Sequence, residues 1–226
     1  MPYQSQLPFK EVIEASIKDM RNSLSQVLFN LDNTINRNES VNKDELVEAQ
    51  YEIVRMQNVI NQLYGLYLVS DDHLVVNSTD TFVMDVVEDA LAGLDTLLKH
   101  KTIEVNIKGE DLSWYLDPQL ISNVLQITLL NALRYTEDTI EIEFTTSEEG
   151  LHISVIDNGK GYPDFILASY EALIAGDPVE NVSSQNAGWF YCDKVVRLHN
   201  NQGVHGHTKL KNNEGSCGGR IDMLIP

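Results

Sequence analysis

An aspartate at the end of a predicted strand begins the stretch of this chain that is best suited to chemistry. Residues 155–162 read VIDNGKGY, so a β-branched run ends in Asp157 and Asn158 and is followed at once by Gly159 and Gly161. Such a run predicts a buried strand that leaves its sheet through a turn where small residues permit a positive φ. A carboxylate there, beside bare backbone amides, could bind an adenine amino group. Asp-Asn-Gly is also ordinary turn chemistry, so a hairpin corner is the alternative interpretation.

A second motif, Asn131-Ala-Leu-Arg-Tyr-Thr136, lies on a predicted helix just upstream, with one predicted strand over 139–145 between the two. Together the motifs resemble the ATP-binding domain of sensor histidine kinases, part of the GHKL ATPase superfamily. In that family a helix carries a pattern like NAxKYT, and a DxGxG strand-turn holds adenine. The matching positions are Asn131, Ala132, Tyr135 and Thr136, with Arg134 in place of the usual Lys, and then Asp157, Gly159 and Gly161.

The resemblance implies a nucleotide site that takes ATP and Mg²⁺, with Asp157 on adenine and Asn131 on the metal. The cofactor-binding residues it implies are Asn131, Arg134, Tyr135, Asp157, Gly159, Gly161 and Gly188. Two departures from the family pattern predict that ATP and Mg²⁺ binding is weakened or absent. Ile127 stands where a second polar side chain is usual, one helical turn before Asn131, and residues 184–189 (SQNAGW) keep only Gly188 of the GxGLGL segment.

Two long amphipathic helices are predicted over residues 9–35 and 43–67, joined by the polar run 36–40. The second has apolar side chains at the repeat of about 3.5 residues that is typical of helix bundles, namely Leu46, Ala49, Ile53, Met56, Ile60, Leu63 and Tyr67. A hairpin of two such helices cannot bury both of its apolar seams alone. Dimerisation into a four-helix bundle is the favoured solution. Packing of the hairpin onto the chain's own C-terminal part is the alternative.

The hairpin resembles the dimerisation and phosphotransfer domain of histidine kinases, but its phosphoacceptor is absent. The family reads much like His-Asp-Leu-Arg-Asn-Ser-Leu where this chain reads Lys18-Asp-Met-Arg-Asn-Ser-Leu24. A lysine ammonium has no lone pair near pH 7, so it cannot attack phosphorus as a neutral imidazole does. An exposed Lys18 with no role is the plainer interpretation, and a permanent cation that mimics or repels a charged state is the other. Autophosphorylation of the usual kind is therefore not expected.

An acidic residue followed three positions later by Asn is retained on the same helix. In the family, a pair like Asp19 and Asn22 is associated with dephosphorylating a partner response regulator, where the amide orients a water. Asn22 shares a helix face with Lys18 by i, i+4 geometry, so it would face a docked partner. Water positioning is most of what a protein contributes to phosphoryl hydrolysis. A surface pair with no role is the alternative.

The remainder of the chain alternates predicted helices and strands. Strands are expected at 73–77, 102–107, 113–116, 139–145, 151–157, 204–211 and 219–224, and helices at 82–100, 118–135, 165–175 and 188–199. The fold expected is α+β, a helical hairpin over residues 1–70 followed by an ATP-binding α/β sandwich over 71–226, with helices on one face of a mixed sheet.

Charge and composition limit the partners of the chain. The formal net charge is −18, which argues against a nucleic-acid or anionic-membrane surface. No apolar run is long enough to span a bilayer, and two lone cysteines among 226 residues suggest a reducing cytoplasm. Because the chain begins almost directly with the hairpin, we expect its input to come from a partner.

The function expected is a two-component signalling homodimer, a pseudokinase that docks the receiver domain of a response regulator and dephosphorylates it. The alternative is an active ATP-dependent enzyme that phosphorylates a partner or an unusual residue of its own. A phosphotransfer intermediate ranks last, because all six histidines lie outside the hairpin.

Overall fold

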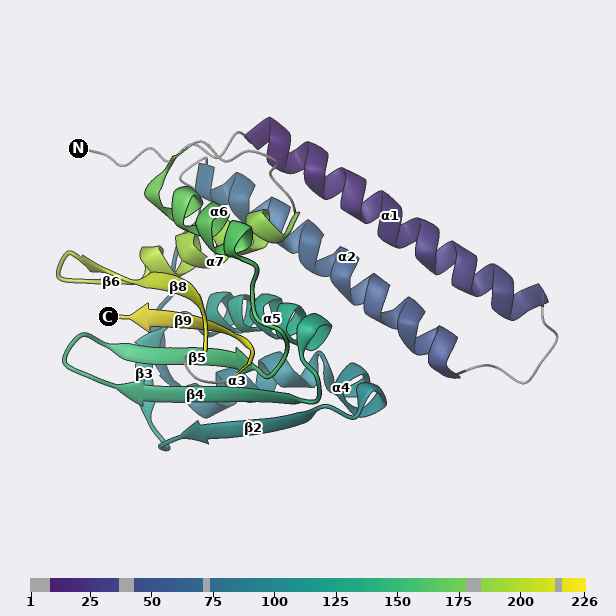
Figure 1. Ribbon diagram of the computed structural model, residues 1–226. Coiled ribbons are helices and arrows are strands. Elements are labelled where there is room, and N and C mark those ends of the chain that lie inside the picture. Colours follow the sequence, from purple (N-terminus) through teal and green to yellow (C-terminus); the bar gives the residue numbers. More distant parts are fainter. Residues whose placement is uncertain (1–8, 37–42, 71–73, 178–183, 214–216) are drawn as a thin grey trace.

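A five-stranded mixed sheet forms the base of the molecule in the computed structural model, which describes residues 9–36, 43–70, 74–177, 184–213 and 217–226 (Figure 1). Its strand order is β2-β4-β5-β9-β8, in which β2 and β4 are parallel and the other neighbours are antiparallel. The strands are β2 (Glu104–Gly109), β4 (Thr139–Thr146), β5 (Leu151–Asp157), β8 (His207–Asn212) and β9 (Gly219–Ile225). Two small pairs accompany the sheet: β1 (Thr79–Phe82) with β3 (Ser113–Leu116), and β6 (Asn200–Asn201) with β7 (Val204–His205).

Helices cover one face of this sheet, as the sequence predicts (Figure 1). They are α3 (Val83–Ala92), α4 (Asp95–Lys101), α5 (Pro118–Tyr135), α6 (Asp164–Ala175) and α7 (Ser184–Leu198). Alternate side chains of β4, such as Ile140 and Ile142, are fully buried together with Ile121 and Leu125 of α5. Asp117 begins α5, because its side chain accepts a hydrogen bond from the Leu120 amide at 3.0 Å and Pro118 occupies the first turn.

Several predicted boundaries are wrong. His73 lies outside the described residues, and residues 74–78 form no strand; the strand is β1, which starts at Thr79 because β3 pairs with it there. The helix expected over 82–100 is broken at Gly93 into α3 and α4. The strand expected over 204–211 is divided at Gly206 into β7 and β8, and α7 begins at Ser184, four residues earlier than predicted.

The helical hairpin consists of α1 (Phe9–Asn36) and α2 (Lys43–Ser70), which lie over the helix layer (Figure 1). Val12 of α1 and Leu66 of α2 belong to the same buried core as the sheet and its helices. At Gly65 the backbone of α2 comes so close to α7 that an added Cβ would lie 2.2 Å from Cε2 of Tyr191. The chain therefore adopts the alternative arrangement, in which the hairpin packs onto its own C-terminal part.

The other side of the hairpin keeps half of the predicted heptad pattern on the surface. Ala49 is buried and Met56 and Leu63 are half-buried, whereas one row of α2 is 42–53% exposed: Leu46, Ile53, Ile60 and Tyr67. Ile17 and Leu24 of α1 are exposed to a similar extent. The apolar seam is thus divided between an intramolecular contact and a free face. Within the described residues, no helix combines the length and apolar character needed to cross a bilayer.

A buried histidine links the end of α7 to the start of α5. His199 accepts a hydrogen bond at Nε2 from the Asp117 amide (3.1 Å), so its Nδ1 carries the proton that is donated to the Val195 carbonyl (2.9 Å). Burial lowers the pKa of His199, and the neighbouring Asp117 carboxylate only partly opposes this.

Acidification is therefore expected to destabilise the fold through His199. Because its folded pKa lies below the unfolded value of about 6.5, the neutral ring contributes stability above that pH, and this is lost as pH falls through the folded pKa. In urea titrations between pH 7.5 and 5.5, His199→Gln should flatten the pH dependence relative to wild type. The exposed His205, changed in the same way, should leave it unaltered; equal effects would contradict the assignment.

Candidate nucleotide and receiver sites

The two sequence motifs are joined through the side chain of Asn158, at the turn after β5. Its Oδ1 accepts hydrogen bonds from the amides of residues 137–139 at 3.1–3.2 Å and lies 2.8 Å from Oγ1 of Thr136. Its Nδ2 donates to Asp138 at 2.7 Å. At Gly159 the turn also lies so close to α5 that an added Cβ would be 2.0 Å from the Tyr135 carbonyl oxygen. The end of α5 and the turn after β5 are therefore held in one fixed arrangement.

Removal of the Asn158 side chain should loosen this junction. We expect Asn158→Ala to lower the free energy of unfolding by about 1–2 kcal/mol, because several hydrogen bonds are lost where water can only partly replace them. Asn213 serves as the control, since its Nδ2 makes a single 3.4 Å contact with the Asp157 carbonyl. Urea denaturation that shows equal losses for the two alanine variants would contradict this role of Asn158.

The carboxylate of Asp157 is buried at the end of β5, 5% exposed. Its Oδ1 accepts a hydrogen bond from the Gly159 amide at 2.9 Å, and the Gly219 amide also donates to this carboxylate. Burial raises the pKa of Asp157, and the two amides lower it to a smaller extent. Gly161 follows with φ of 77°. This end of the predicted site has the shape that the motif implies, a fixed acceptor at a strand end.

Aromatic side chains of the chain itself fill the space beside Asp157. The Tyr162 ring lies against Gly219. Burial raises the pKa of the Tyr162 hydroxyl, and the nearby charge of Asp157 raises it further. Trp189, 1% exposed, meets the Tyr162 ring edge-to-face at 5.8 Å and the Tyr170 ring at 6.0 Å. Trp189 is therefore a core side chain on α7, at a position where the family pattern implied an open glycine-rich segment.

Helix α2 of the hairpin covers the other predicted part of the nucleotide site. Asn131, Arg134 and Gly188 line a cavity of about 60 Å³ whose opposite wall comes from α2, through Tyr51, Arg55, Asn58, Val59 and Gln62. Ile127 contributes to the wall, and Gln62 lies so close to Gly188 that an added Cβ would be 3.3 Å from its Oε1. Tyr135 points its exposed side chain toward the Arg134 guanidinium, with 5.5 Å from the guanidinium carbon to the ring centre. At about 60 Å³ this cavity is far smaller than an ordinary ligand pocket, so the arrangement leaves no room for a nucleotide.

The predicted receiver-facing residues lie on the surface of α1. Lys18 and Asn22 are exposed, and Asp19 is half-buried because its Oδ2 pairs with Nη2 of Arg55 on α2 at 2.9 Å. Arg55 also donates to the buried Ser23 (3.1 Å) and to Glu52 (3.2 Å). The structure thus pairs Asp19 with α2 and leaves the side chain of Asn22 exposed.

Within the described residues, no group of three or more His, Cys, Asp or Glu side chains lies close enough together to hold a metal ion. A magnesium ion at Asn131 would consequently need phosphate oxygens as further ligands.

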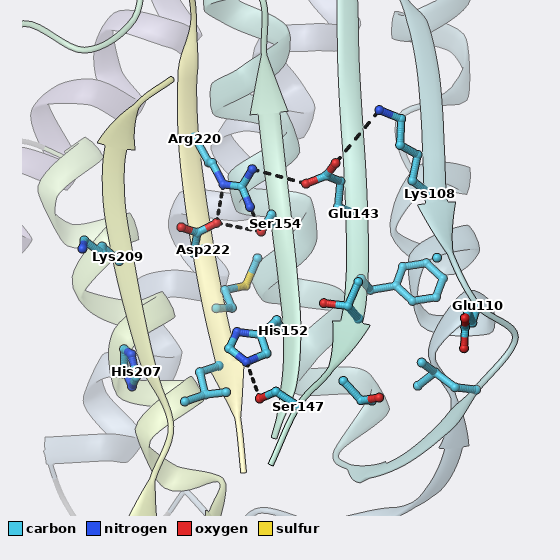
Figure 2. A pocket seen from close by; sticks show the side chains of 17 residues that line it. Lys108, Glu110, Glu143, Ser147, His152, Ser154, His207, Lys209, Arg220 and Asp222 are labelled. Carbon is cyan, nitrogen blue, oxygen red and sulfur yellow. Dashed lines mark hydrogen bonds and ion pairs between the residues drawn. The ribbon is translucent and has the colours of Figure 1, made fainter. Parts of the chain in front are cut away.

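A second hollow lies on the open face of the sheet and involves none of the predicted site residues. It has a volume of about 830 Å³ and is lined by side chains from all five strands of the sheet, with charged groups on β2, β4, β8 and β9 and the helices behind the sheet (Figure 2). Arg220 is its centre, donating to Asp222 (2.6 Å), Glu143 (3.2 Å) and Ser154 (2.9 Å). Because Arg220 and Asp222 of β9 are bonded to Ser154 of β5 and Arg220 also reaches Glu143 of β4, the network links three strands of the sheet.

Sequence reasoning missed the contribution of α2 to the nucleotide region. Arg55 and Gln62 belong to the helix that the heptad pattern assigned to a bundle, and no local motif distinguishes them. Tyr162 directly follows Gly161 and Trp189 directly follows Gly188. Large aromatic residues at those two positions were the available signal that the pocket is filled.

Comparison with known proteins agrees with the fold and the motifs. Residues 116–223 match the family model described as histidine kinase-, DNA gyrase B- and HSP90-like ATPase. Residues 116–223 therefore have the sequence pattern of an ATPase domain of the histidine kinase, DNA gyrase B and HSP90 type.

Individual relatives cover different shares of the chain. It is 26% identical over 128 residues to the sensor histidine kinase CpxA of Escherichia coli, a match that covers 55% of this chain and 28% of CpxA. It is 24% identical over 218 residues to the adaptive-response sensory kinase SasA of Crocosphaera subtropica, covering 88% of this chain and 56% of SasA. The matched part of the chain thus spans 28% of the length of CpxA and 56% of the length of SasA. Among solved structures, full-length ShkA in complex with AMPPNP is similar with a TM-score of 0.62 and 12% identity, covering 96% of this chain and 45% of ShkA.

Proposed function

We propose that this chain is a two-component signalling module that docks the receiver domain of a response regulator and promotes its dephosphorylation, without phosphorylating itself. The observation that carries the proposal is the surface of α1, where an exposed Lys18 occupies the phosphoacceptor position and an exposed Asn22 lies one turn away. An ammonium near a receiver's acidic phosphorylation site would attract it, and the Asn22 amide would orient the attacking water.

The nucleotide region supports the same proposal. Trp189 and Tyr162 fill the space beside Asp157, and α2 covers Asn131. ATP and Mg²⁺ binding would therefore require both the aromatic cluster and the hairpin to move, which weakens it or prevents it. Nucleotide is thus not needed for the proposed action on the receiver.

A homodimer is the form in which we expect the module to act. The exposed row of α2 and the exposed Ile17 and Leu24 of α1 make an apolar face that a second hairpin would cover. Residues 1–70 would provide the dimer and receiver surface, and residues 71–226 the kinase-type domain that packs on it. Both described cysteines are free, consistent with the cytoplasm.

The direct test measures the decay of receiver domains that a small phosphodonor has phosphorylated, with and without the chain. Faster decay of at least one receiver, in the absence of nucleotide, is expected. Unchanged decay of every receiver encoded alongside the protein would remove the proposal.

An active ATP-dependent enzyme is the second candidate, favoured by the intact strand-turn at Asp157. Calorimetric titration with Mg·ATP, with Asp157→Ala as the control, separates the two. Micromolar binding that the variant loses would favour the enzyme. Absence of binding would mean that the ATPase fold serves here as a scaffold for the hairpin.

A further inference from the structure

The cavity between α2 and α5 has a lining suited to binding an anion. Its walls carry two guanidinium groups, Arg55 and Arg134, four neutral polar side chains, Tyr51, Asn58, Gln62 and Asn131, and otherwise apolar groups and Gly188. No carboxylate is among the described residues that line it, although the chain has a net charge of −18. Arg55 is half-buried and Arg134 is exposed, so a negative ligand can reach both positive groups from solvent.

Two carboxamides line this cavity beside the arginines. Gln62 is 7% exposed and Asn131 is half-buried. Each can donate to a phosphate oxygen through its NH₂ group. A cavity of about 60 Å³ has room for one phosphoryl group.

Tyr51 lines the cavity together with both arginines. Burial raises the pKa of Tyr51, and the charges of Arg134 and Arg55 both lower it, so both guanidinium groups lie within electrostatic reach of this side chain. Arg55 comes from the hairpin and Arg134 from the ATP-binding core. Arg134 lies over the Tyr135 ring, whereas Arg55 is held by Asp19, Glu52 and Ser23.

We propose that Arg55 is a shared cation, bound to Asp19 in the closed form and transferred to a phosphoryl group that enters the cavity beside Arg134. The guanidinium is suited to this exchange, because its planar fork binds carboxylate and phosphate in the same manner. The Arg55 guanidinium cannot pair fully with the Asp19 carboxylate and a phosphoryl group at the same time. Binding of a phosphoryl group in the cavity therefore releases Asp19. The inference rests on the proposed function in one respect, the contact of Asp19 with the receiver. If Asp19 makes that contact, then a phosphoryl group in the cavity controls whether Asp19 is available to the receiver.

Competition of this kind is tested by binding alone, with inorganic phosphate as the probe and no metal or receiver present. Arg55→Gln should weaken phosphate binding about tenfold, the loss of one charge-assisted hydrogen-bonding partner. Asp19→Asn should tighten it about fivefold, because the competitor for Arg55 is removed. In the Arg55→Gln background, Asp19→Asn should bring no gain. Arg55→Lys keeps the charge and should bind with intermediate affinity, and thermal melts establish that each variant folds.

Glu48→Gln is the matched control, because Glu48 is an exposed carboxylate on α2 that shares a neighbouring groove with Arg55. Its removal should change the affinity less than twofold. The inference is overturned if neither wild type nor Asp19→Asn binds inorganic phosphate, or if Asp19→Asn and Glu48→Gln have equal effects. It is also overturned if Asp19→Asn still tightens binding when Arg55 is absent. Receiver decay is measured separately, so a failed phosphatase would leave the binding result intact.

Discussion

Replacing Trp189 by alanine is expected to lower the free energy of unfolding by about 3–5 kcal/mol, the range for truncating a large buried aromatic side chain. Trp189 is fully buried and contacts the rings of Tyr162 and Tyr170 edge-to-face, so its loss removes packing on both sides. The expected cost is a large part of the stability of an ordinary domain. Equilibrium denaturation in urea, followed by far-UV circular dichroism, measures it.

Trp114 provides the control, because it is the other tryptophan of the chain and lies half-buried on β3. Its Nε1 is a buried polar atom for which the described residues supply no hydrogen-bond partner. Trp114→Phe removes that unsatisfied donor and should change the stability by less than about 1 kcal/mol. If Trp189→Ala costs no more than Trp114→Phe, then Trp189 is not the core side chain that the structure indicates.

Replacing Asn22 by alanine is expected to slow receiver dephosphorylation by about 10²-fold, the scale for losing the orientation of a reacting group. Asn22 is exposed on α1, so its truncation should leave the fold and the receiver affinity unchanged. The substitution should therefore lower the rate of receiver dephosphorylation at saturating concentrations of the chain. The concentration of the chain that gives half of the maximal rate should remain as in wild type. Decay of a phosphorylated receiver, followed at several concentrations of the chain, separates the two quantities.

Asn61→Ala is the matched control, since Asn61 is an exposed asparagine on α2. It should retain the full rate. A rate that falls equally in both variants would mean that the surface amides of the hairpin contribute to docking and that Asn22 positions no water.

Those features of the fold that depend on local pattern could be predicted from the sequence. The long amphipathic helices, the capped start of α5 at Asp117-Pro118 and the β-branched strand that ends at Asp157 all follow from periodicity and capping chemistry. The likeness of the two motifs to a nucleotide site agrees with the family match over residues 116–223.

Periodicity could not locate the break at Gly93, because Ala90, Leu94 and Leu98 are all buried and continue the helical spacing across it. Strand pairing decided the position of β1, since Val75 is 69% exposed and the apolar residues before Asn77 have no strand to pair with. Both outcomes depend on contacts between segments that lie far apart in the sequence.

The candidate site could be predicted only as a set of motif residues. The heptad pattern of α2 is compatible with both a bundle and an intramolecular contact, and the structure uses alternate positions for each. The presence of Arg55 and Gln62 beside Asn131 follows from the way α2 packs on α5 and α7, for which the sequence offers no local signal except Gly65 opposite Tyr191.

The most direct test of the central claim is incubation of the purified chain with Mg·ATP labelled at the γ-phosphate, alone and with its receiver. The account predicts no label on the wild-type chain and none on Lys18→His, because α2 and the aromatic cluster close the nucleotide site even when an imidazole is supplied. Label that remains on the denatured wild-type chain and disappears in Asn131→Ala would contradict the account and establish an active kinase.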